Sequence, residues 1–220
     1  MTTATSFALA PLSLSARAYR GGGKRLWDLL GAALSLTLAA LPLGLCLLLI
    51  WRESPGAPLI RQWRVGRGGR PFRMWKLRTM RADAEADGHP RFASPHDERV
   101  TPMGGWLRSW HGDELPQLWN VLRGDMSLVG PRPERPEFAA LFAAAIPGYR
   151  ERHRLRPGLT GWAQVACGYA ADLDSTRAKT RLDLEYLAAA SWRLDWRIWC
   201  ATWRVSRRSL QLRARTQVMP

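Results

Sequence analysis

One long apolar run, from Leu29 to Ile50, stands out in the pattern of hydrophobic and polar positions. It contains 22 residues and no charge, which is long enough for a helix that crosses a membrane. Pro42 lies inside it and leaves 13 residues before it and eight after it. At about 1.5 Å per residue the first arm reaches about 20 Å, less than a hydrocarbon core of about 30 Å. Because proline removes a backbone donor and clashes with the preceding turn, we expect a bend at Pro42.

The charges on either side of the run favour a helix that enters and leaves the membrane on one face. Asp28, at the start of the run, is expected to stay at the membrane interface. Because basic residues collect on the cytoplasmic side, both ends of the run are expected there. We therefore predict a re-entrant membrane helix over residues 24–52, broken at Pro42; a single-pass anchor is the alternative on hydropathy alone. The basic residues are Arg17, Arg20, Lys24 and Arg25 before the run, and Arg52, Arg61, Arg64, Arg67 and Arg70 after it.

After this run the pattern predicts short elements separated by turn-forming residues. The segment from Phe72 to Met80 is expected to be extended or a brief strand. Apolar positions at 115, 118, 119 and 122 have helical spacing. The predicted fold is mostly α with short β segments, in which a compact helical domain carries long ordered loops. Helices are expected over Gly104–Trp110, Leu115–Leu122 and Phe138–Ala145, and loops over Glu53–Gly69, Pro90–Pro102 and Gly124–Pro136.

The last predicted helix runs from about Thr180 to about Arg208 and carries four tryptophans on one face. They are Trp192, Trp196, Trp199 and Trp203, at positions i, i+4, i+7 and i+11. Two interpretations stand beside each other. The stripe is either a core-facing stripe with a solvated basic remainder, or the apolar side of an amphipathic helix that lies in the headgroup plane of a membrane.

The composition indicates anionic partners and one folded region. The chain has 220 residues, with 33 Lys and Arg against 18 Asp and Glu, for a formal net charge of +15. The 12 tryptophans favour a membrane surface with anionic lipids, because Trp and Arg both suit the membrane–water boundary. Nucleic acid is not expected, since no helix-turn-helix is recognisable and the arginines are spread along the chain. Three scattered cysteines predict neither a disulfide framework nor a zinc site.

Three regions follow from these patterns. Residues 1–23 are predicted to be a flexible tail, because basic residues come after the apolar part and not before it, unlike a secretory signal. Residues 24–52 form the predicted membrane helix. Residues 53–220 form the predicted domain, which ends in the amphipathic helix, and the length suffices for one sizeable core.

An adjacent pair of acids, Asp113 and Glu114, has a setting that suits phosphate chemistry. Arg108 precedes the pair, and Arg132 follows it between two prolines. Guanidinium groups hold phosphate oxygens in a fork. Two acids close to such groups can serve as nucleophile and as ligand of Mg²⁺, which takes oxygen ligands and shares them with phosphates. Within the same stretch lie Asn120, Asp125 and Ser127.

The stretch GDELPQLWNVLRGDMSLVGPRP, from Gly112 to Pro133, resembles the signature of the bacterial sugar transferase family, the monotopic phosphoglycosyl transferases. The resemblance covers about residues 24 to 205. Five further blocks occur in the family's order, namely KRLWDLLGAALSL, SPGAPLIRQWRVGRGGRPFRMWKLRTM, DERVTPMGGWLR, RPGLTGWAQV and DLEYLAAASWRLDWRIW.

The resemblance implies a reaction at the cytoplasmic face of the bacterial inner membrane. A nucleotide sugar, usually a UDP-sugar, would donate its sugar-1-phosphate to a polyprenyl phosphate, in the initiating step of glycoconjugate or exopolysaccharide synthesis. Asp113 would be the nucleophile and form a covalent phosphosugar intermediate. Glu114 would hold Mg²⁺ or assist the lipid acceptor. Phosphate would be bound by Arg108, Arg132, Lys76 and Arg78.

The chain departs from the family pattern directly before the acid pair. The family usually has a serine and an aliphatic residue there, whereas this chain has His111 and Gly112. A glycine is expected to loosen the turn that aims Asp113. His111 is read as a surface substitution, with a general base as the alternative. The departure motivates a second hypothesis, a catalytically weak member that organises a glycan assembly complex.

The sugar and the oligomeric state stay open on the sequence. Segments Arg81–His96 and Cys167–Arg177 are candidates for choosing the sugar, because such choice depends on a few loop contacts.

Overall fold

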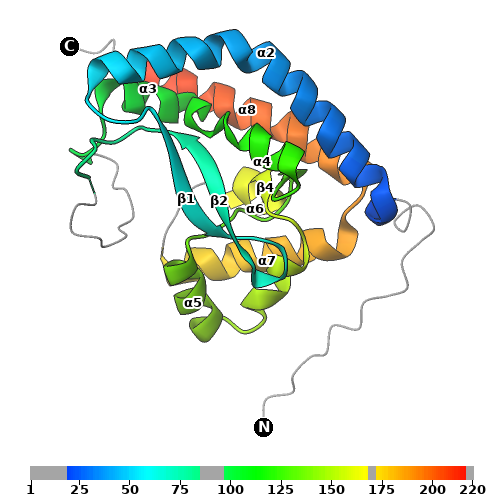
Figure 1. Ribbon diagram of the computed structural model, residues 1–220. Coiled ribbons are helices and arrows are strands. Elements are labelled where there is room, and N and C mark those ends of the chain that lie inside the picture. Colours follow the sequence, from blue (N-terminus) through cyan, green and yellow to red (C-terminus); the bar gives the residue numbers. More distant parts are fainter. Residues whose placement is uncertain (1–18, 85–96, 168–171, 217–220) are drawn as a thin grey trace.

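The structure is a computed structural model that describes residues 19–84, 97–167 and 172–216. It is mostly helical with short strands, as the pattern predicts. Figure 1 shows the long helix α2 arched over one side of the molecule, with α8 beneath it, the β1–β2 hairpin in front, and α5 and α7 on the side away from α2. The helices are α2 Lys24–Glu53, α3 Pro102–Trp110, α4 Gln117–Arg123, α5 Pro136–Ala145, α6 Trp162–Cys167, α7 Leu173–Ala189 and α8 Trp192–Thr216. The strands are β1 Leu59–Val65, β2 Pro71–Leu77, β3 Ser127–Val129 and β4 Gly158–Thr160, and short helical turns are η1 Tyr19–Gly23, η2 Arg67–Gly69, η3 Gly112–Glu114 and η4 Tyr149–Arg154.

Helix α2 covers the predicted membrane segment as one continuous helix. It runs through Pro42 without ending there, and the arch in Figure 1 replaces the predicted break between two helices. Its outer face is a row of exposed leucines, of which Leu41 is the most exposed at 85%. In the described part of the chain α2 is the one helix long and apolar enough to cross a bilayer, judged by length and composition alone. The row consists of Leu30, Leu34, Leu38, Leu41 and Leu45.

Both ends of α2 are fixed to the rest of the chain. At the first turn, Asp28 is buried and its Oδ1 accepts from the Ser127 hydroxyl and from the Leu128 N–H, each at 3.0 Å. Asp28, expected at the membrane interface, is thus buried within the protein, where β3 supplies the donors that a buried carboxylate needs. At the last turn, Cys46 and Ile50 pack against Leu77 and Leu107.

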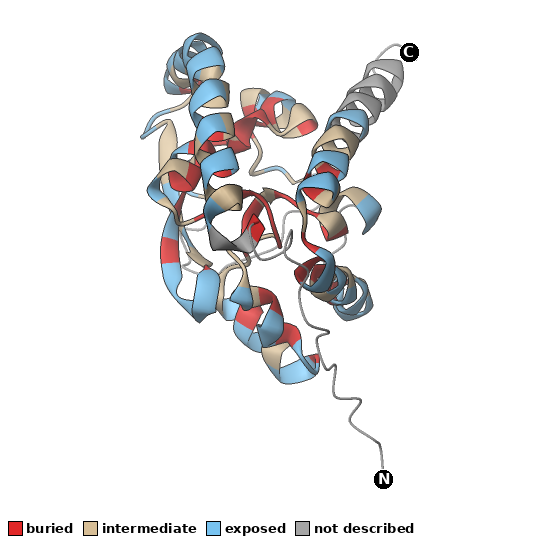
Figure 2. Cartoon of the chain, turned by 90° about the vertical axis from the view of Figure 1, so that its right-hand side faces the viewer, coloured by how far each residue is buried: buried red, intermediate tan, exposed pale blue. Residues whose placement is uncertain are grey.

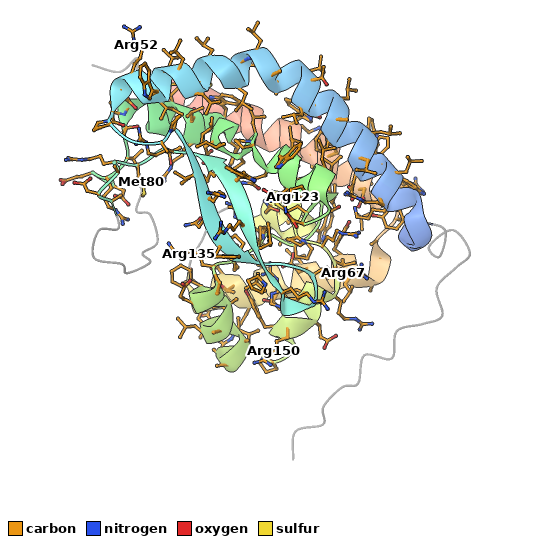
Figure 3. All side chains as sticks on the ribbon, in the orientation of Figure 1. Arg52, Arg67, Met80, Arg123, Arg135 and Arg150 are labelled. Atoms are coloured by element: carbon orange, nitrogen blue, oxygen red, sulfur yellow. The ribbon has the colours of Figure 1, made fainter. Side chains whose placement is uncertain are left out.

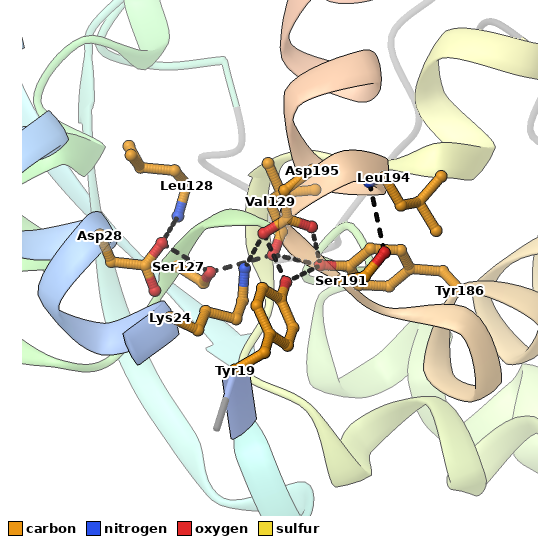
Figure 4. Close-up of polar contacts among 10 residues, drawn as sticks. All are labelled: Tyr19, Lys24, Asp28, Ser127, Leu128, Val129, Tyr186, Ser191, Leu194 and Asp195. Atoms are coloured by element: carbon orange, nitrogen blue, oxygen red, sulfur yellow. Dashed lines mark hydrogen bonds and ion pairs between the residues drawn. The ribbon is translucent and has the colours of Figure 1, made fainter. Parts of the chain in front are cut away.

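The last residues of the predicted tail, Tyr19–Gly23, belong to the described structure. Tyr19 opens turn η1, is buried, and donates its hydroxyl to Asp195 Oδ2. Lys24 forms an ion pair with the same oxygen at 2.6 Å, and the Tyr186 hydroxyl donates to Asp195 Oδ1 at 2.7 Å. Figure 4 shows this cluster between the start of α2 and the start of α8. The Asp195 carboxylate thus joins two segments that lie 176 residues apart in the sequence.

The β1–β2 hairpin is antiparallel, with Arg61 opposite Trp75 and Trp63 opposite Arg73. Each of these arginines lies over the opposite tryptophan ring, at 5.1 Å and 5.0 Å from the ring centroid. These Arg–Trp pairs lie on the outer face of the hairpin, whereas Phe72 and Met74, on its inner face, pack in the core. Strand β2 confirms the extended segment predicted from Phe72, and β1 lies within a stretch predicted to be loop.

The main core lies between α4, the short parallel pair β3–β4 and the last two helices. It includes Leu118, Val121, Met126, Leu128 and Ile198. Figure 2 shows buried residues concentrated on these inner elements and exposed ones along the outer side of α2. Helices α3, α4 and α5 fall where the pattern predicts helices, because each carries apolar residues at helical spacing and is closed by a turn former.

The single helix predicted over residues 180–208 is wrong. The chain turns at Ala190 and Ser191 and forms α7 and α8. Ser191 begins α8, since its carbonyl accepts from Asp195 N–H at 2.9 Å and its hydroxyl from Leu194 N–H at 3.4 Å. The tryptophan stripe divides: Trp199 packs against the core, whereas Trp192, Trp196 and Trp203 are 43%, 56% and 59% exposed. The purely core-facing interpretation therefore does not hold.

Candidate active site

Asp113 and Glu114 lie in turn η3, between α3 and α4. Thr101 begins α3 by accepting Gly104 N–H on its hydroxyl at 3.0 Å, and Pro102 occupies the first turn. The helix ends at His111, which takes a left-handed conformation with φ 63°. The chain then folds back at once, with Glu114 N–H donating to the His111 carbonyl at 3.1 Å. This tight turn places both carboxylates inside the protein, 3% and 6% exposed.

Gly112 has a different role from the one expected. It does not take a positive φ, so the turn does not depend on its conformational freedom. The Trp110 ring lies across its α-carbon, and a Cβ at Gly112 would lie 2.3 Å from two ring carbons. The aromatic ring thus fills the space of a side chain. His111 supplies the left-handed residue and lies close to Glu114.

Asp113 is paired with a lysine from the hairpin. Lys76 Nζ lies 2.7 Å from Asp113 Oδ2, and the two side chains are 18% and 4% exposed. Lys76 is on β2, whose edge is held against α4 by Asn120. The Asn120 Oδ1 accepts from Trp75 N–H at 2.9 Å, and its Nδ2 donates to the Arg73 carbonyl at 2.8 Å. The amide of Asn120 therefore sets the register between Lys76 and the acid pair.

Glu114 is paired with Arg132 in a fork. Arg132 Nη2 donates to Glu114 Oε1 at 2.8 Å, and Nη1 lies 3.5 Å from Oε2. Burial alone raises the pKa of a carboxyl, but the charges of Arg132 and Lys76 outweigh it and lower the pKa of Glu114 to about 2. Glu114 is therefore ionised at neutral pH and is a poor proton donor.

Arg108 and Arg78, both predicted to bind phosphate, have different positions. Arg108 Nε donates to the Thr79 hydroxyl at 2.8 Å. Burial lowers the pKa of Arg108, and the Asp113 carboxylate opposes this shift, which indicates that the two side chains are close. Arg78 instead binds the end of α2, donating to the carbonyls of Pro55 at 2.5 Å and Ser54 at 2.7 Å. Its hydrogen bonds with described residues do not reach the acid pair.

A loop held by four successive carbonyls supports Arg132. The carbonyls of Pro131, Arg132, Pro133 and Glu134 accept, in that order, from Gly158 N–H at 2.9 Å, Arg152 Nη2 at 2.9 Å, Arg64 Nη1 at 3.2 Å and Val65 N–H at 2.9 Å. Sequence reasoning assigned no role in the site to Arg64 or Arg152. The two prolines indicate a fixed backbone, but the donors come from distant segments and leave no local signal.

Two further cations lie near Arg132. Burial and the charge of Arg132 lower the pKa of Arg64 to about 10, so it stays charged at neutral pH. Burial also lowers the pKa of Lys179, on α7, with Arg132 contributing in the same direction. The acid pair thus has cations around it from β1, β2, α3 and the Arg132 loop. Other basic side chains, such as Arg52, Arg67 and Arg150, are spread over the molecule, as Figure 3 shows.

The protein supplies only part of the ligand set that Mg²⁺ needs. Among the described residues no group of three or more His, Cys, Asp or Glu could hold a metal. Asp113 and Glu114 offer two adjacent carboxylates, and Mg²⁺ commonly takes one or two carboxylates together with substrate phosphates and water. These two residues would therefore hold the ion in the presence of a phosphorylated substrate.

Most of the chain matches a known family. The sequence profile of the bacterial sugar transferases matches residues 19–209. The chain belongs to the bacterial sugar transferase family.

This bacterial sugar transferase is similar to proteins whose names give a donor and an acceptor. It is 46% identical over 172 residues to the UDP-N-acetylgalactosamine-undecaprenyl-phosphate N-acetylgalactosaminephosphotransferase of Aeromonas hydrophila, which aligns 78% of this chain and 40% of that protein. It is 44% identical over 178 residues to the UDP-glucose:undecaprenyl-phosphate glucose-1-phosphate transferase of Caulobacter vibrioides, which aligns 80% of this chain and 64% of that protein. The chain therefore spans less than two thirds of either relative.

A third relative matches this bacterial sugar transferase along most of its length. The protein of Bacillus subtilis named uncharacterized sugar transferase EpsL is 37% identical over 180 residues, with 81% of this chain and 84% of that protein aligned. The first two names differ in the sugar. The segments expected to choose it lie partly outside the described residues, at 85–96 and 168–171. Residues 173–177, expected to be loop, belong to α7.

Proposed function

We propose that this bacterial sugar transferase moves a sugar-1-phosphate from a UDP-sugar to polyprenyl phosphate. The observation that carries the proposal is the buried acid pair, in which Asp113 is held by Lys76 and Glu114 by Arg132. Arg108 and Arg64 add positive charge around it. A diphosphate donor brings the negative charge that this arrangement attracts, and the names of the relatives give the same donor and acceptor classes.

In the first step, a carboxylate oxygen of Asp113 attacks the phosphorus that carries the sugar. The bond from that phosphorus to the bridging oxygen breaks, and UMP leaves with the electron pair. The product is a phosphosugar bound covalently to Asp113. Lys76 pairs with Asp113 in the resting site, and the donor phosphates compete for the same ammonium. When Lys76 turns to the phosphate oxygens, the carboxylate is freed next to its target.

In the second step, an oxygen of the polyprenyl phosphate attacks the same phosphorus. Asp113 leaves as a carboxylate, and polyprenyl diphosphate sugar is formed. The lowered pKa of Glu114 makes it a weak base. Its charge therefore suits the holding of Arg132 and Mg²⁺ better than proton transfer. Asp113 and Glu114 would hold Mg²⁺, and the ion would supply positive charge for the phosphate oxygens.

The attachment of α2 supports a re-entrant arrangement at the membrane. Its first turn is bonded to β3 and α8 through Asp28 and Lys24. Its last turn is bonded to α3, where Met103 N–H donates to Glu53 Oε1 at 2.7 Å. A straight helix of 30 residues is about 45 Å long, and a body on one side of a bilayer could not hold both ends of a helix that crossed it. The arch instead lowers the leucine row into one leaflet.

The exposed aromatic side chains support the same orientation. Trp27 on α2 and Trp192 and Trp196 on α8 form edge-to-face contacts, with ring centroids 6.2 Å and 6.4 Å from Trp27. Indole rings favour the membrane–water boundary, and arginines nearby favour anionic headgroups. In this arrangement α8 lies in the headgroup plane of the cytoplasmic face, and the acid pair lies within reach of a lipid phosphate.

The test is release of UMP by the purified full chain in lipid nanodiscs with Mg²⁺, polyprenyl phosphate and a panel of UDP-sugars. Asp113→Asn is expected to abolish release, whereas Glu151→Gln, a carboxylate-to-amide change on the surface, should leave it unchanged. Without polyprenyl phosphate in the nanodiscs, each enzyme molecule is expected to release one UMP in a burst. The mass of the protein is then expected to increase by one phosphosugar. No release with any sugar, or equal release from Asp113→Asn, would contradict the proposal and favour a scaffold role.

A further inference from the structure

The carbonyl of Arg132 is held by a buried ion pair that lies outside the acid pair. Arg152, on η4, donates through Nη2 to the Arg132 carbonyl at 2.9 Å. The same guanidinium binds Asp183 Oδ2 of α7 through Nε at 2.8 Å and Nη2 at 2.7 Å. Arg152 and Asp183 are 5% and 2% exposed. Such a pair is rigid, because its charges lie away from water and each is satisfied by fixed partners.

All three nitrogens of the Arg152 guanidinium have partners. Its Nη1 donates to the Tyr149 hydroxyl at 3.1 Å, and its carbon lies 5.1 Å from the centroid of the Tyr149 ring. The contacts with Asp183 and Tyr149 thus fix its plane, and Nη2 also donates to one backbone carbonyl, that of Arg132. That carbonyl belongs to the residue whose side chain forks onto Glu114 at 2.8 Å. A chain of contacts therefore runs from α7 to the acid pair.

We infer that Arg152 and Asp183 are positioning residues for the transfer reaction and act through Arg132 on the donor phosphates. The inference rests on the proposed function. Neither residue contacts the acid pair in the described contacts. Asp183 orients Arg152, Arg152 fixes the backbone of Arg132, and the Arg132 fork then holds Glu114 and meets the phosphate at a set angle. A shift of the Arg132 backbone would turn this fork away from both.

The experiment is a double-mutant cycle on UMP release by the full chain. Asp183→Asn keeps the size of the side chain but replaces one acceptor oxygen with a donor. It is expected to raise KM for the UDP-sugar and to lower kcat/KM about tenfold, which corresponds to about 1.4 kcal/mol. In the Arg132→Lys background the same substitution should lower kcat/KM less than twofold, because the fork through which Asp183 acts is already lost.

Controls separate positioning from loss of folded protein. A smaller folded fraction lowers the apparent kcat but leaves KM unchanged, so an unchanged KM in folded Asp183→Asn would overturn the inference. Equal effects in both backgrounds would overturn it as well. Glu185→Gln, two positions further along α7 with an exposed carboxylate, should behave as wild type. If Asp183→Asn does not fold, Arg152→Lys takes its place in the same cycle; failure of the wild type to release UMP would instead reject the proposed function.

Discussion

Substituting Gly112 by alanine would place a methyl group in the space that the Trp110 ring occupies. The added carbon would lie 2.3 Å from Cη2 and Cζ2 of the ring and 2.7 Å from Cε2. Carbon atoms pack at about 3.5–4.0 Å, so the ring must move by more than about 1 Å. Trp110 packs against the cluster that contains Leu77 and Leu107, and its ring lies edge-on to that of Trp106 with centroids 5.2 Å apart. These neighbours limit where the ring can move.

Overpacking of this kind costs about 1–3 kcal/mol. For a chain of this length it should lower the melting temperature by roughly 2–12 °C, at about 2–4 °C per kcal/mol. Because Asp113 is the next residue, the displacement also reaches the proposed nucleophile. A misplacement of about 1 Å can cost about a hundredfold in rate, so UMP release by Gly112→Ala should fall by tenfold or more.

A matched glycine and a rescue variant make the result decisive. Gly105 lies in α3, where an added Cβ would meet only a Val100 methyl group at 4.0 Å. Gly105→Ala should therefore keep or raise the melting temperature, since alanine favours helix by about 1 kcal/mol. Trp110→Leu combined with Gly112→Ala should recover stability lost in Gly112→Ala. If Gly112→Ala behaves like Gly105→Ala, the close contact with the Trp110 ring does not govern the turn.

Three further outcomes follow from the same contacts. Lys76→Met leaves the buried Asp113 without its cation and should lower kcat for UMP release about a hundredfold. Arg73→Met, on the outer face of the same strand, is the control. A change in kcat within twofold for Lys76→Met would reject the role of Lys76 in the transfer. Lys24→Met leaves the Asp195 carboxylate buried without a charge partner and should lower the unfolding free energy by about 3 kcal/mol, as measured by chemical denaturation in detergent. A loss below about 0.5 kcal/mol would count against a buried ion pair between Lys24 and Asp195. Burial lowers the pKa of His153 from 6.5 to about 4. The unfolded chain therefore binds a proton at higher pH than the folded chain, and stability falls as pH drops from 6.5 towards 4. His153→Gln should weaken this pH dependence of the melting temperature, and an unchanged dependence would contradict the prediction.

Patterns within about ten residues predicted much of the fold. Helices α3, α4 and α5 were expected where they lie, because the spacing of apolar residues and the turn formers beside them are local signals. Strand β2 was expected for the same reason. Strand β1 was missed, since its partner β2 supplies the pairing and the turn formers on either side resemble a loop. The break between α7 and α8 was missed because the sequence around Ala190 contains no glycine or proline.

The candidate site divides in the same way. The sequence by itself determined the acid pair, the arginines near it and the resemblance to a family, because these are matters of residue type and order. Only the tertiary structure decided which cation serves which carboxylate: Lys76 pairs with Asp113 and Arg132 with Glu114, whereas Arg78 binds the end of α2. Asp28 was placed at the membrane interface by its local setting and is buried against β3. The physical reason is the distance along the chain over which each effect acts. Backbone propensity and periodicity act over one or two turns, whereas a charged side chain takes the partner that folding brings to it, and the partners of Asp28, Arg132 and Asp195 come from segments that no local pattern connects.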